Sequence, residues 1–133
     1  MHKFFIVGGA ILGGVGVGLG AFGAHALRPV LEAAQRMETF ETAVKYQFYH
    51  ALALLVIGLL VSKTDNRLIR YSGYLMFWGT LVFSGSLYVL CFTGIRWLGA
   101  ITPVGGVLMI AGWGLLAWAA MSSNQPPAPK GSR

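Results

Sequence analysis

The chain has 133 residues, of which 56% are hydrophobic and 11% are charged, whereas soluble domains carry about 25% charged residues. A domain of this size has a large surface for its volume, and ten basic plus four acidic side chains are too few to make that surface polar. The composition therefore excludes an ordinary soluble domain and indicates a protein embedded in a lipid bilayer. The net charge of +6 does not indicate nucleic-acid binding, because the basic residues flank apolar runs and form no patch.

Four apolar runs have the length of about 20 residues that a membrane-spanning helix needs. They cover residues 4–24, 40–61, 71–93 and 103–121. The first run exceeds the 7–15 apolar residues typical of a signal-peptide core, so we expect it to remain as an uncleaved helix. At the fourth, Thr102 is expected to cap the helix and Pro103 to occupy its first turn.

A shorter helix is predicted between the first two spans, within residues 27–39. Pro29 suits its first turn. Val30, Ala33, Ala34 and Met37 would share one face of it. Such an amphipathic segment is expected to lie on the outer membrane surface.

The distribution of basic residues predicts that both termini are cytoplasmic, because Lys and Arg collect in cytoplasmic loops. One side of the membrane would hold six of them: Lys3, Lys63, Arg67, Arg70, Lys130 and Arg133. The other side would hold four: Arg28, Arg36, Lys45 and Arg96. The predicted fold is therefore all-α, an integral membrane four-helix bundle formed by residues 1–121 as one domain. Residues 122–133, which are polar and rich in proline, are expected to form a disordered tail.

Small residues on the first span predict close helix packing, since association in lipid depends on close contact rather than on burial of apolar surface. One face would carry Gly9, Gly13, Gly16, Gly20 and Gly23. A second stripe contains Gly14, Gly18 and Ala21. With two such faces, we expect the first span to lie at the centre of the bundle. The alternative is that one of the small-residue stripes mediates self-association between copies of the chain.

One group of polar residues is expected near the outer end of the bundle. It comprises His25, Tyr46, Gln47, His50, Tyr88 and Thr102. Three interpretations compete: structural residues bonded within the bundle, a ligand pocket, and a catalytic or metal site. A metal site needs further oriented ligands that the sequence does not supply, and nucleophile motifs, phosphate loops and paired intramembrane carboxylates are not found in it. We therefore predict no metal, no cofactor and no catalytic residue.

Several stretches of the chain resemble those of a family of small bacterial membrane proteins, the domain-of-unknown-function family 423, whose eukaryotic relatives are called transmembrane protein 256. The stretches are LGAFGAHAL at 19–27, YQFYHALAL at 46–54, FSGSLY at 83–88, ITPVGG at 101–106 and AGW at 111–113. The resemblance implies a four-span protein of the cell inner membrane and implies no activity.

Two functional hypotheses follow. The first is a non-enzymatic component surrounded by membrane lipids, which is either an accessory or assembly partner of a larger complex or a self-associating bundle. The alternative is a ligand-handling or transport protein that binds a lipid, a quinone or a small polar molecule at the outer end. Transport is disfavoured because the sequence has no obvious internal repeat and no charged residue deep in a span.

Overall fold

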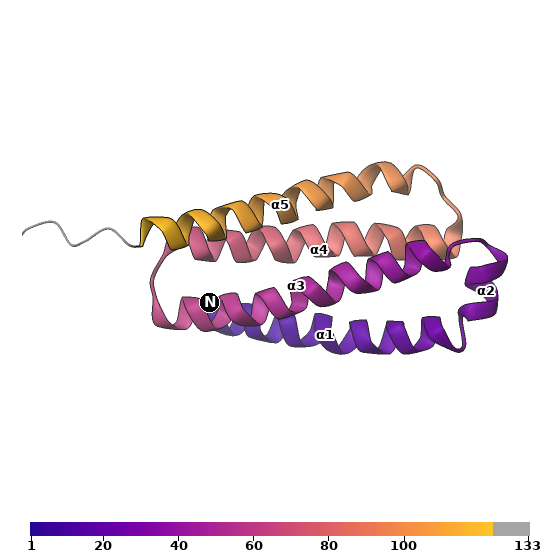
Figure 1. The fold of residues 1–133 in the computed structure, drawn as a ribbon, viewed down its shortest axis with the longest axis horizontal. Coiled ribbons are helices and arrows are strands. Elements are labelled where there is room, and N and C mark those ends of the chain that lie inside the picture. Colours follow the sequence, from indigo (N-terminus) through magenta and orange to yellow (C-terminus); the bar gives the residue numbers. More distant parts are fainter. Residues whose placement is uncertain (124–133) are drawn as a thin grey trace, which may run out of the picture.

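The computed structural model describes residues 1–123, and helices are the only regular secondary structure in that range. The helices are α1 (His2–Ala24), α2 (Arg28–Ala33), α3 (Met37–Lys63), α4 (Arg67–Thr93) and α5 (Leu98–Ser122). Figure 1 shows the four long helices side by side, with α2 crossing from the end of α1 to the start of α3. The predicted all-α four-helix bundle is confirmed. The tail that was expected to be disordered falls largely in residues 124–133, which lie outside the described part of the chain.

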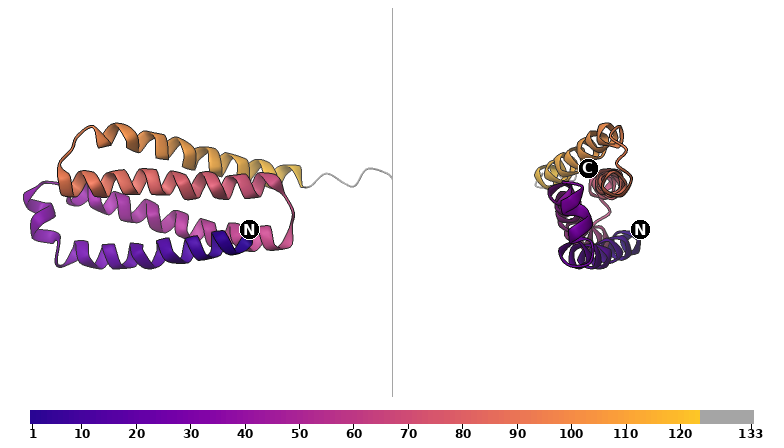
Figure 2. Two further views of the ribbon diagram at one scale, coloured as in Figure 1. Left: turned by 180° about the vertical axis from the view of Figure 1, so that it is seen from behind. Right: turned by 90° about the vertical axis from the view of Figure 1, so that its right-hand side faces the viewer.

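The four long helices pack in chain order, with α1 against α3, α3 against α4 and α4 against α5. Seen end-on in Figure 2, α1 and α5 lie on opposite sides of the central pair. The predicted central position of the first span is therefore wrong. Only one of its two small-residue faces is used: a Cβ atom added to Gly14 or Gly18 would meet nothing within 4 Å.

The helices begin earlier or end later than the apolar runs, because hydrogen bonding continues into the polar flanks. The largest difference is at α5, which begins at Leu98 and contains Pro103 in its interior. A turn with i→i−3 bonds over residues 95–100 starts the helix upstream of the proline. Thr102 is thus not the predicted cap, and its hydroxyl instead bonds to the carbonyl of Leu98 at 3.3 Å.

The short helix α2 is present and buries one side chain, Leu31, against the bundle. Leu31 is fully buried, whereas Val30 is 59% exposed. Leu31 belongs to a small apolar cluster with Phe40 and Cys91, so it fastens α2 to the ends of α3 and α4. The larger apolar core lies further along the bundle and includes Phe5, Leu54 and Met76 among its buried side chains.

Glycines bring the backbones of α4 and α5 close together. A Cβ atom on Gly105 would overlap the backbone nitrogen of Phe83 and lie 2.7 Å from the carbonyl oxygen of Gly79. A Cβ atom on Gly112 would lie 2.7 Å from Met76 Cγ. Close backbone approach through small residues is the usual way in which helices associate in lipid.

Each of the four is long and apolar enough to cross a membrane, with a mean hydropathy between 1.6 and 2.0 over its most apolar 18 residues. Their outer surfaces are also apolar, as Ile11, Leu59 and Ile110 illustrate. Figure 1 shows the N-terminus and the α3–α4 loop at one end of the bundle, hereafter the N-terminal end. The other end, which carries α2 and the α4–α5 loop, is called the α2 end.

Candidate functional site

The predicted group of polar residues extends from the α2 end of the bundle to its middle, and another buried polar side chain, Ser72, lies nearer the N-terminal end. His50 lies thirteen residues from either end of α3, which corresponds to about 20 Å on each side at 1.5 Å per residue. Gln47 bonds to the carbonyl of Leu12, which lies near the midpoint of α1. The expectation that this group gathers near one end of the bundle is therefore wrong for these two residues, because α3 extends as far beyond His50 on one side as on the other.

Gln47 connects three helices through both ends of its amide. Its Nε2 donates to the carbonyl of Leu12 on α1 at 2.8 Å, and its Oε1 accepts a 2.7 Å bond from the hydroxyl of Tyr88 on α4. The residue is only 3% exposed. Gly16 leaves room for it, since a Cβ there would come within 3.4 Å of the Gln47 nitrogen. An amide without these partners would be costly in a medium that offers no water.

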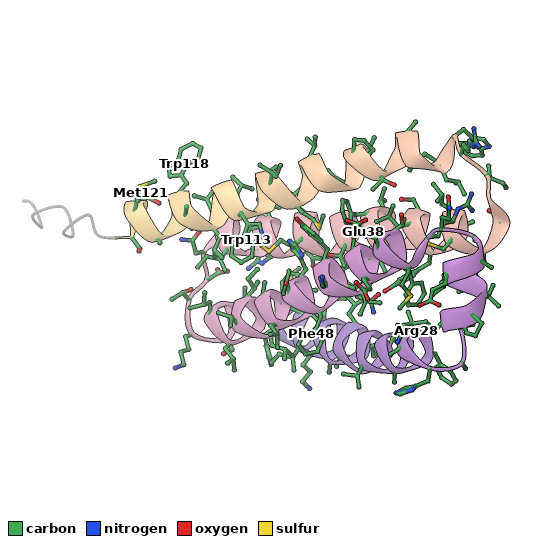
Figure 3. The ribbon with its side chains drawn as sticks, turned by 45° about the vertical axis from the view of Figure 1, so that its right-hand side comes forward. Arg28, Glu38, Phe48, Trp113, Trp118 and Met121 are labelled. Carbon is green, nitrogen blue, oxygen red and sulfur yellow. The ribbon has the colours of Figure 1, made fainter. Side chains whose placement is uncertain are left out.

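His50 uses both ring nitrogens within the bundle. Nδ1 lies 2.7 Å from the carbonyl oxygen of Tyr46, and a carbonyl only accepts, so Nδ1 carries the proton. Nε2 accepts a 3.0 Å bond from the indole Nε1 of Trp113 on α5. These partners assign one neutral tautomer to the imidazole. In Figure 3, Trp113 lies on the side of α5 that faces the other helices, whereas Trp118 points away.

Hydroxyl groups connect α4 to its neighbours. Ser84 donates to the carbonyl of Ala43 on α3 at 2.8 Å. Ser86 and Thr102 share a 2.6 Å hydrogen bond between α4 and α5. These side chains are buried, and each bond joins α4 to a neighbouring helix.

Arg36, whose expected role was only to set the orientation of the chain in the membrane, also bonds to another helix. It donates a 2.6 Å bond to the carbonyl of Leu90 in the last turn of α4. This carbonyl also accepts from the backbone N–H of Gly94 and lies at the negative end of the helix dipole. Gly94 ends that helix in a left-handed conformation with φ of 72°, and the Arg36 guanidinium packs beside it. A glycine directly after a long apolar run was the only available sequence signal for this helix end.

The six predicted site residues do not form a single site. Tyr46 and His50 line one groove, and Gln47 and Tyr88 line another. Thr102 is bonded to Ser86. His25 is exposed at the end of α1 and lines only a shallow depression with Ala21, Phe22 and Ala26. Residues 1–123 contain no group of three or more His, Cys, Asp or Glu side chains that could hold a metal ion.

The five predicted packing glycines lie along the side of α1 that faces α3. Their Cβ positions approach Ala51, Gln47, Val44 and Phe40. The contact is tightest at Gly23, where an added Cβ would overlap the Phe40 ring. The closest approach to a backbone atom is at Gly9, where an added Cβ would lie 2.8 Å from the carbonyl oxygen of Ala51.

Apolar outer surfaces, four helices of spanning length and internally bonded polar groups together define a multi-pass integral membrane protein. The chain matches the model of the family described as "Protein of unknown function (DUF423)" over residues 19–106, and it belongs to that family. The resemblance seen in the sequence is thereby confirmed.

The chain also aligns with curated membrane proteins over nearly their whole length. A UPF0382 membrane protein of Staphylococcus epidermidis is 50% identical over 119 residues, covering 90% of this chain and 96% of the relative. A similar protein of Staphylococcus haemolyticus is 50% identical over 114 residues, covering 86% and 92%. UPF0382 membrane protein YwdK of Bacillus subtilis is 45% identical over 120 residues, covering 90% and 97%. No solved structure matches the chain significantly.

Proposed function

We propose that residues 1–121 act as a single non-enzymatic membrane domain that assembles with a second copy of itself, or with a larger membrane complex, through the outer face of α1. The observation that carries this proposal is the open surface at Gly14 and Gly18, where an added Cβ would meet nothing within 4 Å. The two glycines are spaced four apart, as in the small-xxx-small pattern through which spanning helices associate. Ala21 continues the same exposed face.

The interior of the bundle supports a non-enzymatic role. Gln47, His50, Ser84 and Tyr88 all bond to groups on neighbouring helices. Their hydrogen-bonding capacity is thus used to hold helices together, and their arrangement does not resemble a nucleophile paired with a base.

Gly14→Leu should abolish association while leaving the bundle folded, because its side chain would project from the open face and keep a partner helix away. The measurement is the mass of the protein in nanodiscs formed directly from the membrane. Gly114→Leu is the matched control, since Gly114 also faces open space, but on α5. The proposal is wrong if the unchanged protein is a lone monomer in these discs. It is also wrong if the Gly14→Leu variant assembles to the same extent as the unchanged protein.

The same proposal places the chain in the cytoplasmic (inner) membrane with both termini on the cytoplasmic side. The N-terminal end carries Lys3, Lys63, Arg67 and Arg70, and basic residues near short loops favour the cytoplasm. At the α2 end, one of the opposing basic residues, Arg36, is bonded to the end of α4.

Cysteine labelling in intact cells tests this orientation. A maleimide that cannot cross the membrane should label Val30→Cys at once, but Thr64→Cys only after permeabilisation, because the two exposed positions lie at opposite ends of the bundle. The native Cys91 is buried, so the unsubstituted protein serves as the background control. The reverse labelling pattern would show that the orientation is inverted.

A further inference from the structure

We infer that the groove between α3, α4 and α5 is a binding site for a neutral, membrane-soluble ring compound that carries a carbonyl group, such as a quinone head group. This inference goes beyond assembly through α1 and does not depend on it. The groove has a volume of about 330 Å³ and is lined mainly by Tyr46, His50, Phe83, Gly106, Met109 and Trp113. Binding pockets for small ligands begin at about this size.

Aromatic rings form much of the groove wall. The Tyr46 ring lies 5.0 Å from the Phe83 ring and is stacked on the His50 imidazole at 6.4 Å. The indole of Trp113 meets the same imidazole edge-on at 5.9 Å. These centroid separations fall within the range in which aromatic rings attract one another. A planar ring that enters the groove would find the same kind of contacts.

Hydrogen bonds hold this wall in place. The 3.0 Å bond from Trp113 to His50 joins α5 to α3 across the groove, and the bond from Nδ1 to the Tyr46 carbonyl fixes the imidazole in turn. The His50 ring is therefore a positioned part of the wall. Tyr46 is 41% exposed and brings a phenol hydroxyl, which can donate a hydrogen bond to a ligand oxygen.

The depth and charge of the groove restrict what can occupy it. His50 is at the midpoint of α3, which is far from the level of lipid head groups. Its lining contains no acidic residue, no lysine and no arginine, so a charged molecule would enter without compensation. An acyl chain offers no hydrogen-bond acceptor to the phenol of Tyr46, which lines the groove. A neutral ring with a carbonyl acceptor satisfies both the aromatic wall and the hydroxyl.

The probe for this inference is a benzoquinone with a ten-carbon tail, and decanol is the control for the tail alone. Trp113 reports binding by fluorescence quenching in a protein whose other tryptophans, Trp78, Trp97 and Trp118, are replaced by Phe. All three are exposed. In nanodiscs we expect quenching to saturate, and decanol not to displace the probe at equal concentration.

Gly106→Leu should weaken binding at least tenfold, because the added side chain would fill the groove. A Cβ at Gly106 would make only ordinary contact with Phe83, at 3.8 Å, so the variant should still fold. Gly114→Leu, on the open face of α5, should bind as the unchanged protein does. Tyr46→Phe keeps the ring, removes the hydroxyl and should weaken binding severalfold, which provides a second readout if Gly106→Leu does not fold.

Three results would overturn the inference. Quenching that rises linearly with probe would mean partitioning into lipid alone. Equal displacement by decanol would mean that the groove holds an acyl chain. Unchanged affinity in both Gly106→Leu and Tyr46→Phe would place the probe elsewhere on the protein.

Discussion

Gly105→Ala should lower the free energy of unfolding by about 3 kcal/mol, at the upper end of the range for overpacking. The added methyl would overlap the backbone nitrogen of Phe83 and lie 2.8 Å from its Cα and 2.7 Å from the carbonyl oxygen of Gly79. These are backbone atoms, so a change of rotamer cannot relieve the overlap and α4 and α5 must separate. The loss can be measured by titrating the protein with SDS in mixed micelles.

The matched control for this prediction is Gly114→Ala on the same helix. Its methyl would meet nothing within 4 Å, and alanine favours a helix interior by up to about 1 kcal/mol relative to glycine. The control should therefore be neutral or slightly stabilising. Equal stability of the two variants would show that α4 and α5 do not pack at Gly105.

The four long helices could be predicted from the sequence because a bilayer imposes a length requirement that apolar runs reveal directly. Their order in space could not be predicted in the same way. The first span offers two stripes of small residues that look alike in sequence, and contact with a neighbour alone distinguishes Gly9 from Gly14. The contact that anchors α2 could not be predicted either, because Leu31 is buried by Phe40 and Cys91 from other helices.

The arrangement of the predicted polar group could not be derived from the sequence. Gln47 and His50 are three residues apart, which places them about 60° apart around a helix of 3.6 residues per turn. That difference directs Gln47 to α1 and α4 and His50 to α5. Trp113 was missed as a partner, although an indole N–H away from the membrane surface needs an acceptor when buried.

Gly9→Leu should detach α1 from α3 and lower the free energy of unfolding by about 3 kcal/mol or more. An added Cβ at this position would lie 2.8 Å from the carbonyl oxygen of Ala51 and 3.2 Å from Leu54 Cβ. Leucine adds three further carbons beyond that point. Because α1 packs mainly on α3 and meets α4 chiefly through Phe4 and Phe5 near its N-terminus, the other helices offer little to compensate for the lost contact.

The prediction is checked by comparing the free energy of unfolding of leucine variants at three glycines of α1, because the loss should depend on which face of the helix each glycine lies on. Gly14→Leu introduces the same side chain five residues along the helix, where an added Cβ would meet nothing within 4 Å, and should retain the stability of the unchanged bundle. Gly20→Leu should fall between the two, because its nearest neighbour is a Val44 methyl at 3.4 Å, which can move more easily than a backbone carbonyl. Equal unfolding curves for Gly9→Leu and Gly14→Leu would mean that α1 has no preferred face toward α3.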